Sequence, residues 1–354
     1  MASQASGLEP GSNGGVEVGK ARATEPVLEC TDIVQEFRVR QRGLRPKATV
    51  SAVAGVSLSI QRGETYAIVG ETGSGKSTLA RAIVGDPAPV RGTIKLNGRV
   101  VRGRRERSRL VSMVFQEPMS ALDPRWSVEQ IVSEPLRALG SLPREDRRRR
   151  VAEALDVVGL NAHRYADRRP RELSGGQAQR VAIARALVAS PQLVICDEPV
   201  TALDVSTQAQ ILDLLQDLKR EFGLTYLLIA HDLSVVRVLA DRVATMHLGR
   251  LCEEGSTATV FDRPAHPYTG ALLSAIPPKG KPARTTSRIR LLGEPPSPLH
   301  PPTGCRFHTR CSYAQDVCAE KDPELVPLGS AQKVACFFPL TSLAPGTTAG
   351  RAVR

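Results

Sequence analysis

Four short, mostly apolar runs recur along the chain, each followed by a polar residue or a glycine-rich segment. They cover residues 65–69, 110–115, 193–196 and 225–229. Short apolar runs of this kind are typical of strands in a parallel sheet that is covered on both faces. Apolar positions recur at helical spacing in other segments, namely residues 77–84, 128–139, 147–158 and 178–188. Strands and helices that alternate in this way predict an α/β fold.

The helical segments place their apolar side chains on one face. In residues 128–139, Ser127 is a suitable N-cap, and Pro135 should kink or split the helix because it lacks an N–H group. The buried faces expected of the other three segments are formed by Leu79, Ile83 and Val84; by Val151, Leu155 and Val158; and by Val181, Ile183, Ala184 and Leu187.

The two ends of the chain differ from the middle. Residues 1–19 are rich in Gly and Ser and contain acids, so they do not resemble a secretory signal peptide, and we expect residues 1–25 to form a disordered tail. After about residue 255 proline becomes dense and helical periodicity fades, which predicts a second, smaller domain over residues 256–340. Residues 341–354 are expected to be a tail.

Composition narrows the class of protein. With 41% hydrophobic and 24% charged residues, the chain has the composition of a globular protein, and no segment approaches the roughly 20 apolar residues of a membrane-spanning helix. The net charge of +12 comes partly from the basic runs 102–109 and 144–150, which contain no aromatic residues for stacking on bases. Solvated arginines on exposed faces are the simplest interpretation, and contact with anionic lipid headgroups is the alternative.

A phosphate-binding loop follows the first apolar run. Its glycines let backbone N–H groups point at an anion, the helix that follows adds its dipole, Lys76 supplies a charge to the β- and γ-phosphates, and the Ser77 hydroxyl suits Mg²⁺. The strand, loop and helix context that this motif requires is present. The residues expected to contact the nucleotide here are Gly70, Glu71, Thr72, Gly73, Ser74, Gly75, Lys76, Ser77 and Thr78.

Two acids follow the third apolar run. A strand over residues 193–196 delivers Asp197 and Glu198 to the carboxyl end of the sheet, where ligands bind in open α/β folds. Asp197 suits the metal, and Glu198 suits the attacking water as a general base or positioning group.

A glycine pair opens the helical segment 178–188. Ser174 is a good N-cap, Gly175 and Gly176 leave backbone N–H groups accessible, and Gln177 lies 20 residues before Asp197. Together with the phosphate loop and the two acids, this pattern resembles the ATP-binding-cassette (ABC) ATPases. The resemblance implies a P-loop NTPase fold of the ABC type: a RecA-like core with an antiparallel β subdomain over residues 26–255, and a helical subdomain over about 117–173.

The resemblance also implies roles for residues outside these motifs. Gln116 matches the lid glutamine that senses Mg²⁺ and the attacking water. His231 matches the switch histidine at the γ-phosphate, Phe37 the aromatic residue that stacks on adenine, and Asp204 the loop that communicates across a dimer. Two cassettes would then enclose two ATP molecules, each between one chain's phosphate loop and the other chain's glycine pair. Met119, Leu122 and Trp126 are expected either to line the groove for a membrane subunit or to pack in the core.

The C-terminal region resembles that of oligopeptide/dipeptide importer ATPases in residues 261–269 and in four cysteines, Cys305, Cys311, Cys318 and Cys336. Four thiolates suit a metal or an iron–sulfur cluster, and the absence of a Cys-x-x-Cys pair argues against an ordinary zinc ribbon. The resemblance implies a [4Fe-4S] cluster; zinc or unliganded thiols are the alternatives. Cys30, Cys196 and Cys252 are expected to be buried small residues.

The function implied by the resemblance is ATP hydrolysis, with Mg²⁺, that energises peptide import at the cytoplasmic face of the membrane. The implied partners are two permease subunits, a second ABC ATPase in a homo- or heterodimer, and an extracytoplasmic peptide-binding protein, with no nucleic acid. The alternatives are an importer of nickel or another small solute, a soluble ABC ATPase that acts on nucleic acid or ribosomes, and a module that binds ATP without turnover.

Overall fold

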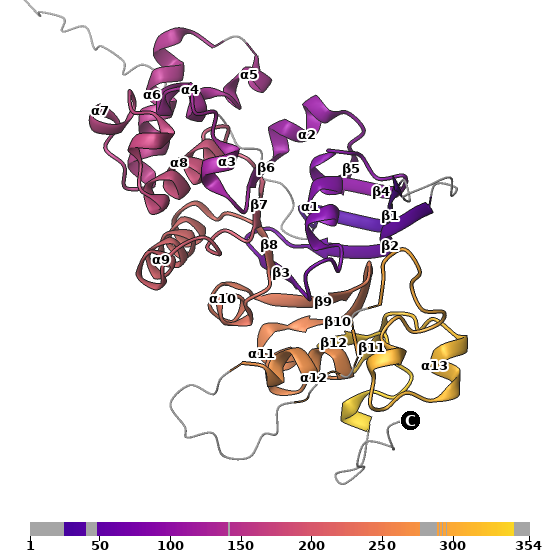
Figure 1. The fold of residues 1–354 in the computed structure, drawn as a ribbon. Coiled ribbons are helices and arrows are strands. Elements are labelled where there is room, and N and C mark those ends of the chain that lie inside the picture. The colour runs from indigo at the N-terminus through magenta and orange to yellow at the C-terminus, as the bar shows by residue number, and fades with distance from the viewer. Residues whose placement is uncertain are drawn as a thin grey trace, which may run out of the picture.

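The computed structural model describes residues 25–39, 48–140, 142–276, 289, 291, 293–294 and 296–342. Their central feature is an eight-stranded sheet in which β9, β3, β8, β7 and β6 run parallel (Figure 1). In spatial order its strands are β11 (Val326–Leu328), β12 (Gln332–Val334), β10 (Arg250–Ser256), β9 (Arg242–His247), β3 (Thr65–Val69), β8 (Tyr226–Ala230), β7 (Leu193–Asp197) and β6 (Val111–Val114).

A second, antiparallel sheet of four strands holds the N-terminal part of the described chain. Its order is β2 (Ala48–Ile60), β1 (Leu28–Val39), β4 (Arg91–Leu96) and β5 (Arg99–Val100). Helices α1 (Lys76–Val84) and α2 (Arg104–Leu110) lie beside it in Figure 1. The expected antiparallel β subdomain is therefore present.

The central strands are buried on both faces, and alternate residues enter two different hydrophobic cores. Val194 and Cys196 of β7 pack with helices α8 (Gly175–Leu187) and α9 (Val205–Phe222), whereas Leu193 and Ile195 pack with α1 and the antiparallel sheet. This alternation follows from the period of two in a strand, and it explains why the sequence of these strands reads as continuous apolar runs. Cys30, Cys196 and Cys252 are buried as predicted.

A lobe of helices lies against one edge of the central sheet, beyond β6 (Figure 1). Ser127 caps α4, and the predicted split at Pro135 is confirmed, because one helix ends at Ser133 and the next begins at Leu136. Leu122 is buried in the core of this lobe, while Met119 is exposed. The lobe consists of α3 (Pro118–Ala121), α4 (Val128–Ser133), α5 (Leu136–Leu139), α6 (Arg144–Val157), α7 (Ala162–Tyr165) and α8.

The C-terminal extension is joined to the sheet of the cassette. Strand β12 pairs with β10, so strands from both sides of residue 256 share one ladder. The expectation that helical periodicity fades here is wrong for residues 257–274, which contain α11 (Thr257–Asp262) and α12 (Pro267–Ser274). Pro267 begins α12 instead of interrupting a helix, because a proline in the first turn loses no intrahelical hydrogen bond. Helices α10 (Leu233–Leu239) and α13 (Asp316–Glu320) complete this part of the fold.

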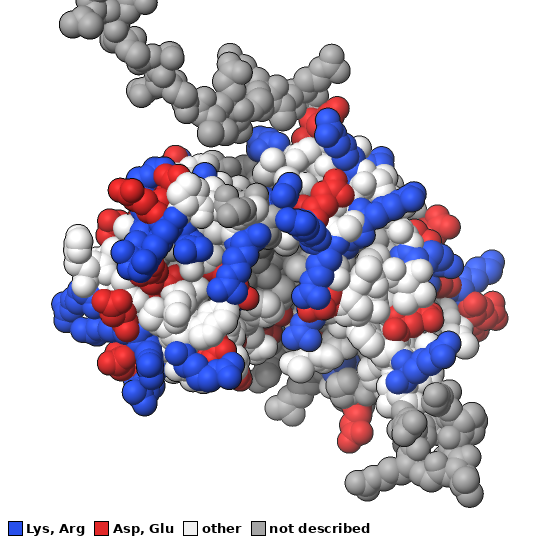
Figure 2. All heavy atoms as spheres, turned by 90° about the horizontal axis from the view of Figure 1, so that it is seen from above, with Lys and Arg blue, Asp and Glu red and all other residues white. Residues whose placement is uncertain are grey.

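In the two basic runs, 102–109 and 144–150, the arginines are exposed or partly exposed, with one exception. Figure 2 shows Lys and Arg side chains spread over the upper face, with acidic side chains between them. Arg107 is instead buried, and its guanidinium donates to the carbonyl oxygens of Val101 and Ala82 at 2.9 and 3.0 Å. In the described part of the chain, no helix is long and apolar enough to cross a membrane. Of the tails expected over residues 1–25 and 341–354, all but residues 25, 341 and 342 lie outside the described residues.

Candidate nucleotide site

The elements that carry the predicted site end side by side. Strands β3, β8, β7 and β6 are consecutive parallel neighbours, so their carboxyl ends meet along one edge of the sheet. The phosphate loop follows β3, His231 follows β8, Glu198 follows β7, and Gln116 lies two residues after β6. Residues separated by up to 155 positions, from Lys76 to His231, therefore come from adjacent strands.

Close packing of the phosphate loop requires glycine at two positions. A Cβ atom on Gly70 would lie 2.1 Å from the carbonyl oxygen of Met246, and one on Gly75 would lie 2.1 Å from that of Ala52. Gly75 also has φ = 103°, a conformation that other residues rarely adopt, and α1 begins directly after it. These close approaches therefore restrict the backbone conformation of the loop where it passes between the two sheets.

Lys76 is held inside this loop. Its Nζ atom donates to the carbonyl oxygens of Gly70 at 2.8 Å and Glu71 at 3.0 Å. Burial lowers the pKa of Lys76, while the nearby carboxylates of Glu198, Asp197 and Glu71 oppose that decrease. The ammonium group is thus fixed at the centre of the glycine-rich turn.

Ser77 and Asp197 form a pair of oxygen groups beside Lys76. The Ser77 hydroxyl donates to Asp197 Oδ1 at 2.9 Å. The pKa of Asp197 is raised, mainly because its carboxyl group is buried. The hydrogen bond from Ser77 and the charges of Arg81 and Lys76 partly oppose this increase. Hydroxyl and carboxylate oxygens are the ligands that Mg²⁺ prefers, so the chemistry of this pair fits that ion.

Three side chains converge on one oxygen of Glu198. Gln116 Nε2 donates to Glu198 Oε2 at 2.9 Å, Thr201 Oγ1 donates to it at 3.1 Å, and His231 Nδ1 lies 3.0 Å from it. The Glu198 side chain is only 14% exposed, while that of His231 is 47% exposed. The structure therefore assembles Gln116, Glu198 and His231 into one cluster, which the sequence could associate only through a family pattern.

The glycine pair lies elsewhere, at the start of α8. Ser174 is exposed and accepts a hydrogen bond from the backbone N–H of Gln177 at 3.3 Å, while Gln177 Oε1 accepts from the N–H of Ser174 at 3.0 Å. Gln177 also donates to the Tyr165 hydroxyl at 3.2 Å. A Cβ atom on Gly176 would lie 2.6 Å from Thr207 Cγ2, so a larger residue here would require the Thr207 side chain to shift. These contacts join the motif to the helical lobe and to α9.

Two further predicted residues lie on other elements. Phe37 lies on β1 and is 39% exposed, which leaves part of its ring available for stacking. Asp204 caps α9: its carboxylate accepts from the N–H of Thr207 at 2.9 Å and from the Ser206 hydroxyl at 2.6 Å. These hydrogen bonds hold the pKa of Asp204 well below its usual range.

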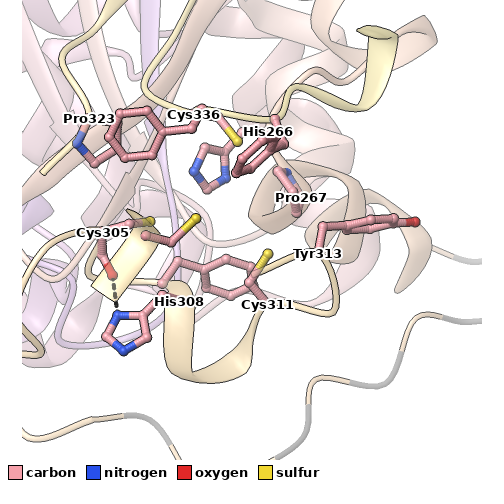
Figure 3. A pocket seen from close by; sticks show the side chains of 12 residues that line it. His266, Pro267, Cys305, His308, Cys311, Tyr313, Pro323 and Cys336 are labelled. Atoms are coloured by element: carbon pink, nitrogen blue, oxygen red, sulfur yellow. Dashed lines mark hydrogen bonds between the residues drawn. The ribbon is translucent and has the colours of Figure 1, made fainter. Parts of the chain in front are cut away.

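The four C-terminal cysteines line one small pocket together with His266 and Phe307 (Figure 3). The pocket has a volume of only about 10 Å³, room for roughly one water molecule. Burial raises the pKa of Cys311 to about 11 and that of Cys336 to about 12, and the neighbouring thiolates add to both increases. Metal ligation requires thiolates, and within the described ranges no group of three or more Cys, His, Asp or Glu side chains is arranged to hold a metal ion. The donor types fit a cluster, but their arrangement as it stands does not.

Sequence reasoning missed two residues that contact the phosphate loop. Tyr268 accepts a hydrogen bond from the backbone N–H of Glu71 at 2.8 Å, and Arg310 Nη1 donates to Glu71 Oε2 at 2.8 Å. The two residues lie 197 and 239 positions from Glu71. In the sequence, residues 261–269, which contain Tyr268, are distinguished only by their resemblance to the importer ATPases. No motif spacing identifies Arg310, which directly precedes Cys311.

Comparison with known families agrees with this geometry. Residues 53–201 match the ABC transporter family, and residues 252–318 match the family described as the oligopeptide/dipeptide transporter C-terminal region. The first match contains the phosphate loop, the glycine pair and both acids, and the second contains three of the four cysteines.

Individual proteins give the same result. The dipeptide transport ATP-binding protein DppF of Escherichia coli is 44% identical over 323 residues, which cover 90% of this chain and 96% of that protein. The oligopeptide transport ATP-binding protein AppF of Bacillus subtilis is also 44% identical, over 89% of this chain and 98% of its own length. A solved structure of the ATP-binding cassette MJ0796, a dimer in a post-hydrolysis state bound to ADP and Pi, has a TM-score of 0.57 and 31% identity and covers 65% of this chain and 98% of its own. The chain therefore belongs to the ATP-binding subunits of ABC transporters, in the branch that carries the oligopeptide/dipeptide transporter C-terminal region.

Proposed function

We propose that this chain hydrolyses ATP to drive the import of dipeptides or oligopeptides through a membrane transporter. As a member of the ABC family it is an ATPase. The observation that carries the proposal is the convergence of Gln116, Thr201 and His231 on Glu198, next to the Ser77–Asp197 pair. The relatives named for dipeptide and oligopeptide transport support peptides as the cargo, and they do not support nickel import or action on nucleic acid.

The mechanism assigns one task to each group around the sheet edge. Lys76 and the N–H groups of the loop bind the β- and γ-phosphates, and Ser77, Asp197 and Gln116 would hold Mg²⁺, which would supply charge neutralisation for those phosphates. Glu198 orients the attacking water and accepts its proton, while His231 contacts the γ-phosphate. The hydrogen bonds to Glu198 Oε2 hold that carboxylate in place.

Closure requires a second cassette. Ser174 and Gly175 are exposed, so they suit the γ-phosphate held by a partner. Exposed Phe37 suits adenine, and Asp204 suits communication across the interface. Because ATP bridges both chains, its binding favours the closed pair and loss of the γ-phosphate reopens it. The partner is a second copy or a similar ATPase, beside two permease subunits and an extracytoplasmic peptide-binding protein at the cytoplasmic face of the membrane.

The test is peptide uptake into membrane vesicles that contain the assembled transporter. The Glu198→Gln variant should retain ATP binding but lose ATP hydrolysis and peptide uptake by at least about 100-fold, because it cannot accept a proton from water. Unchanged hydrolysis in this variant would remove the role given to Glu198. Hydrolysis without peptide-dependent uptake in the unaltered protein would reject the cargo and leave the ATPase assignment in place.

We further infer that the cysteine quartet holds a [4Fe-4S] cluster with a structural role. The likeness of the extension to peptide importers and the presence of four thiol donors around one pocket support it, and the thiols must move from their present arrangement to hold the cluster. Protein purified without oxygen should contain about four iron and four sulfide per chain. One zinc, or no metal, would reject the cluster. A Cys311→Ser variant that unfolds and hydrolyses ATP like the unaltered protein would reject the structural role.

A further inference from the structure

The C-terminal extension holds the phosphate loop at Glu71 by two separate contacts. Arg310 Nη1 donates to the Glu71 carboxylate at 2.8 Å, and the Tyr268 hydroxyl accepts the backbone N–H of the same residue at 2.8 Å. Tyr268 is fully buried, and the Arg310 side chain is 7% exposed. Both the side chain and the backbone of Glu71 are therefore fixed from outside the cassette core.

Glu71 in turn contacts the lysine of the loop. Lys76 Nζ donates to the Glu71 carbonyl oxygen at 3.0 Å and to that of Gly70 at 2.8 Å. The peptide groups on either side of Glu71 thus set the place of the ammonium group. A shift of Glu71 would therefore move the ammonium group of Lys76, to which the proposed function assigns phosphate binding.

The same contacts continue to the pocket lined by the cysteines. Phe307, which lines that pocket, lies 5.3 Å from the Tyr268 ring and 5.5 Å from the His247 ring between centroids. Arg310 donates its backbone N–H to the Phe307 carbonyl at 3.0 Å and directly precedes Cys311. The short segment between Cys305 and Cys311 therefore forms the pocket wall and also carries the arginine that holds the loop.

The two contacts at Glu71 are not what holds the extension on the cassette. Strand β12 pairs with β10, Arg250 forms an ion pair with Asp322 at 2.7 Å, and Gln332 donates to Glu253. These contacts lie on β10 and its neighbours and involve no residue of the phosphate loop. Loss of the Arg310–Glu71 pair would leave them in place.

We propose that Arg310 and Tyr268 are positioning residues for ATP binding, through which the C-terminal extension sets the conformation of the phosphate loop. The proposal rests on the proposed role of that loop in nucleotide binding. Arg310 also neutralises the Glu71 carboxylate, which would otherwise repel the phosphates. Removal of Arg310 leaves that charge uncompensated, whereas removal of both partners does not.

Steady-state ATP hydrolysis by the full chain tests this with Arg310→Gln, Glu71→Gln and the double variant. Arg310→Gln should raise the KM for ATP about tenfold and change kcat less than about twofold, because the Glu71 carboxylate, which is 29% exposed, loses its partner. The double variant should stay within about twofold of Glu71→Gln alone, since the uncompensated charge is gone. Lys321→Gln, which removes a positive charge from an exposed position of the extension, should leave KM unchanged.

A purely structural Arg310 would give a different result, because its loss would be as harmful in the Glu71→Gln background as in the unaltered protein. An unchanged KM in Arg310→Gln, or an equal increase in KM in both backgrounds, would overturn the proposal. If Arg310→Gln does not fold, Tyr268→Phe carries the test, because it keeps the ring and removes only the acceptor for the Glu71 N–H. It should raise KM about threefold, and an unchanged KM would overturn the proposal. Absence of hydrolysis in the unaltered protein would instead reject the proposed function.

Discussion

Glu198 has a backbone conformation that few residues other than glycine adopt. Its φ angle is 48°, in the left-handed region, and such a residue costs about 1–3 kcal/mol unless its surroundings fix it. The N–H of Glu198 donates to the Ile229 carbonyl at 2.9 Å, and its side chain receives hydrogen bonds from Gln116 and Thr201. These contacts offset the strain and hold the carboxylate at the sheet edge, as the proposed role in hydrolysis requires.

His247 should make the stability of the protein depend on pH. Burial lowers its pKa to about 4; Glu71 opposes the decrease, and Arg310 and Arg306 reinforce it. An unfolded histidine has a pKa of about 6.5, so the folded state binds fewer protons between these values. The contribution is fully present above pH 6.5 and is lost as pH falls towards 4, with a slope of at most about 1.4 kcal/mol per pH unit.

The measurement is urea unfolding at pH 7, 6 and 5. In His247→Phe the slope of unfolding free energy against pH should fall by about 1 kcal/mol per unit. Phenylalanine keeps the ring contacts with Tyr268 and Phe307; His247 Nε2 has no hydrogen-bond partner, and the hydrogen bond lost is the one to the Arg306 backbone. Replacement of the exposed His163 by Gln is the control and should not change the slope. Equal slopes in His247→Phe and the unaltered protein would contradict the prediction.

Sequence predicted the residues at the strand ends but missed the long-range partners of Glu71. Asp197 ends β7 and His231 follows β8, so the apolar run before each residue was enough to place it at a strand end, whereas the role of His231 came from the family pattern. Arg310 and Tyr268 reach Glu71 across 239 and 197 residues, and no spacing along the chain encodes that contact. Arg107 was expected among solvated arginines because its neighbours are charged, but it satisfies buried carbonyl groups between elements.

At the scale of elements, α4 and α8 begin with nearly identical capping boxes. Ser127 and Ser174 each accept a backbone N–H at 3.3 Å, and the glutamine three residues later accepts the backbone N–H of that serine at 2.9 Å in α4 and 3.0 Å in α8. Both start signals are visible in the sequence. The split at Pro135 was also predictable, whereas the helix beginning at Pro267 was not, since proline marks both starts and breaks.

Replacing the two N-cap serines should distinguish an effect on folding stability from an effect on ATP hydrolysis. Ser127→Ala and Ser174→Ala should each lower the unfolding free energy by about 1 kcal/mol, because each removes one N-cap acceptor. Only Ser174→Ala should also lower ATP hydrolysis, by at least about tenfold, since we propose that Ser174 contacts the γ-phosphate of a partner chain. Unfolding and hydrolysis assays on both variants check this. Equal hydrolysis in the two would reduce Ser174 to a helix cap.

At the scale of the whole molecule, the extension completes the sheet of the cassette. Strand β10 contains Glu253 and Glu254, both almost fully buried. Glu253 accepts the backbone N–H groups of Ala265 and His266 at 2.9 and 2.8 Å, and Gln332 also donates to it. The pKa of Glu253 is raised, mainly because its carboxyl group is buried, and these hydrogen-bond donors partly oppose the increase. Every one of these partners lies after residue 256, so the boundary expected from composition divides the chain where the structure is continuous.

A chain that ends at Ser256 should therefore fail to fold properly, although it contains every motif of the ATP site. It would expose the hydrogen-bonding edge of β10, which favours pairing with other chains, and it would leave Glu253 without partners at a cost of several kcal/mol. We expect aggregation in size-exclusion chromatography and no measurable ATP hydrolysis. A chain that ends at Ser342 keeps β12 and should behave like the full protein. If the shorter chain is soluble, monomeric and fully active, the extension is an independent appendage; loss of folding would show that the carboxylates of β10 depend on it.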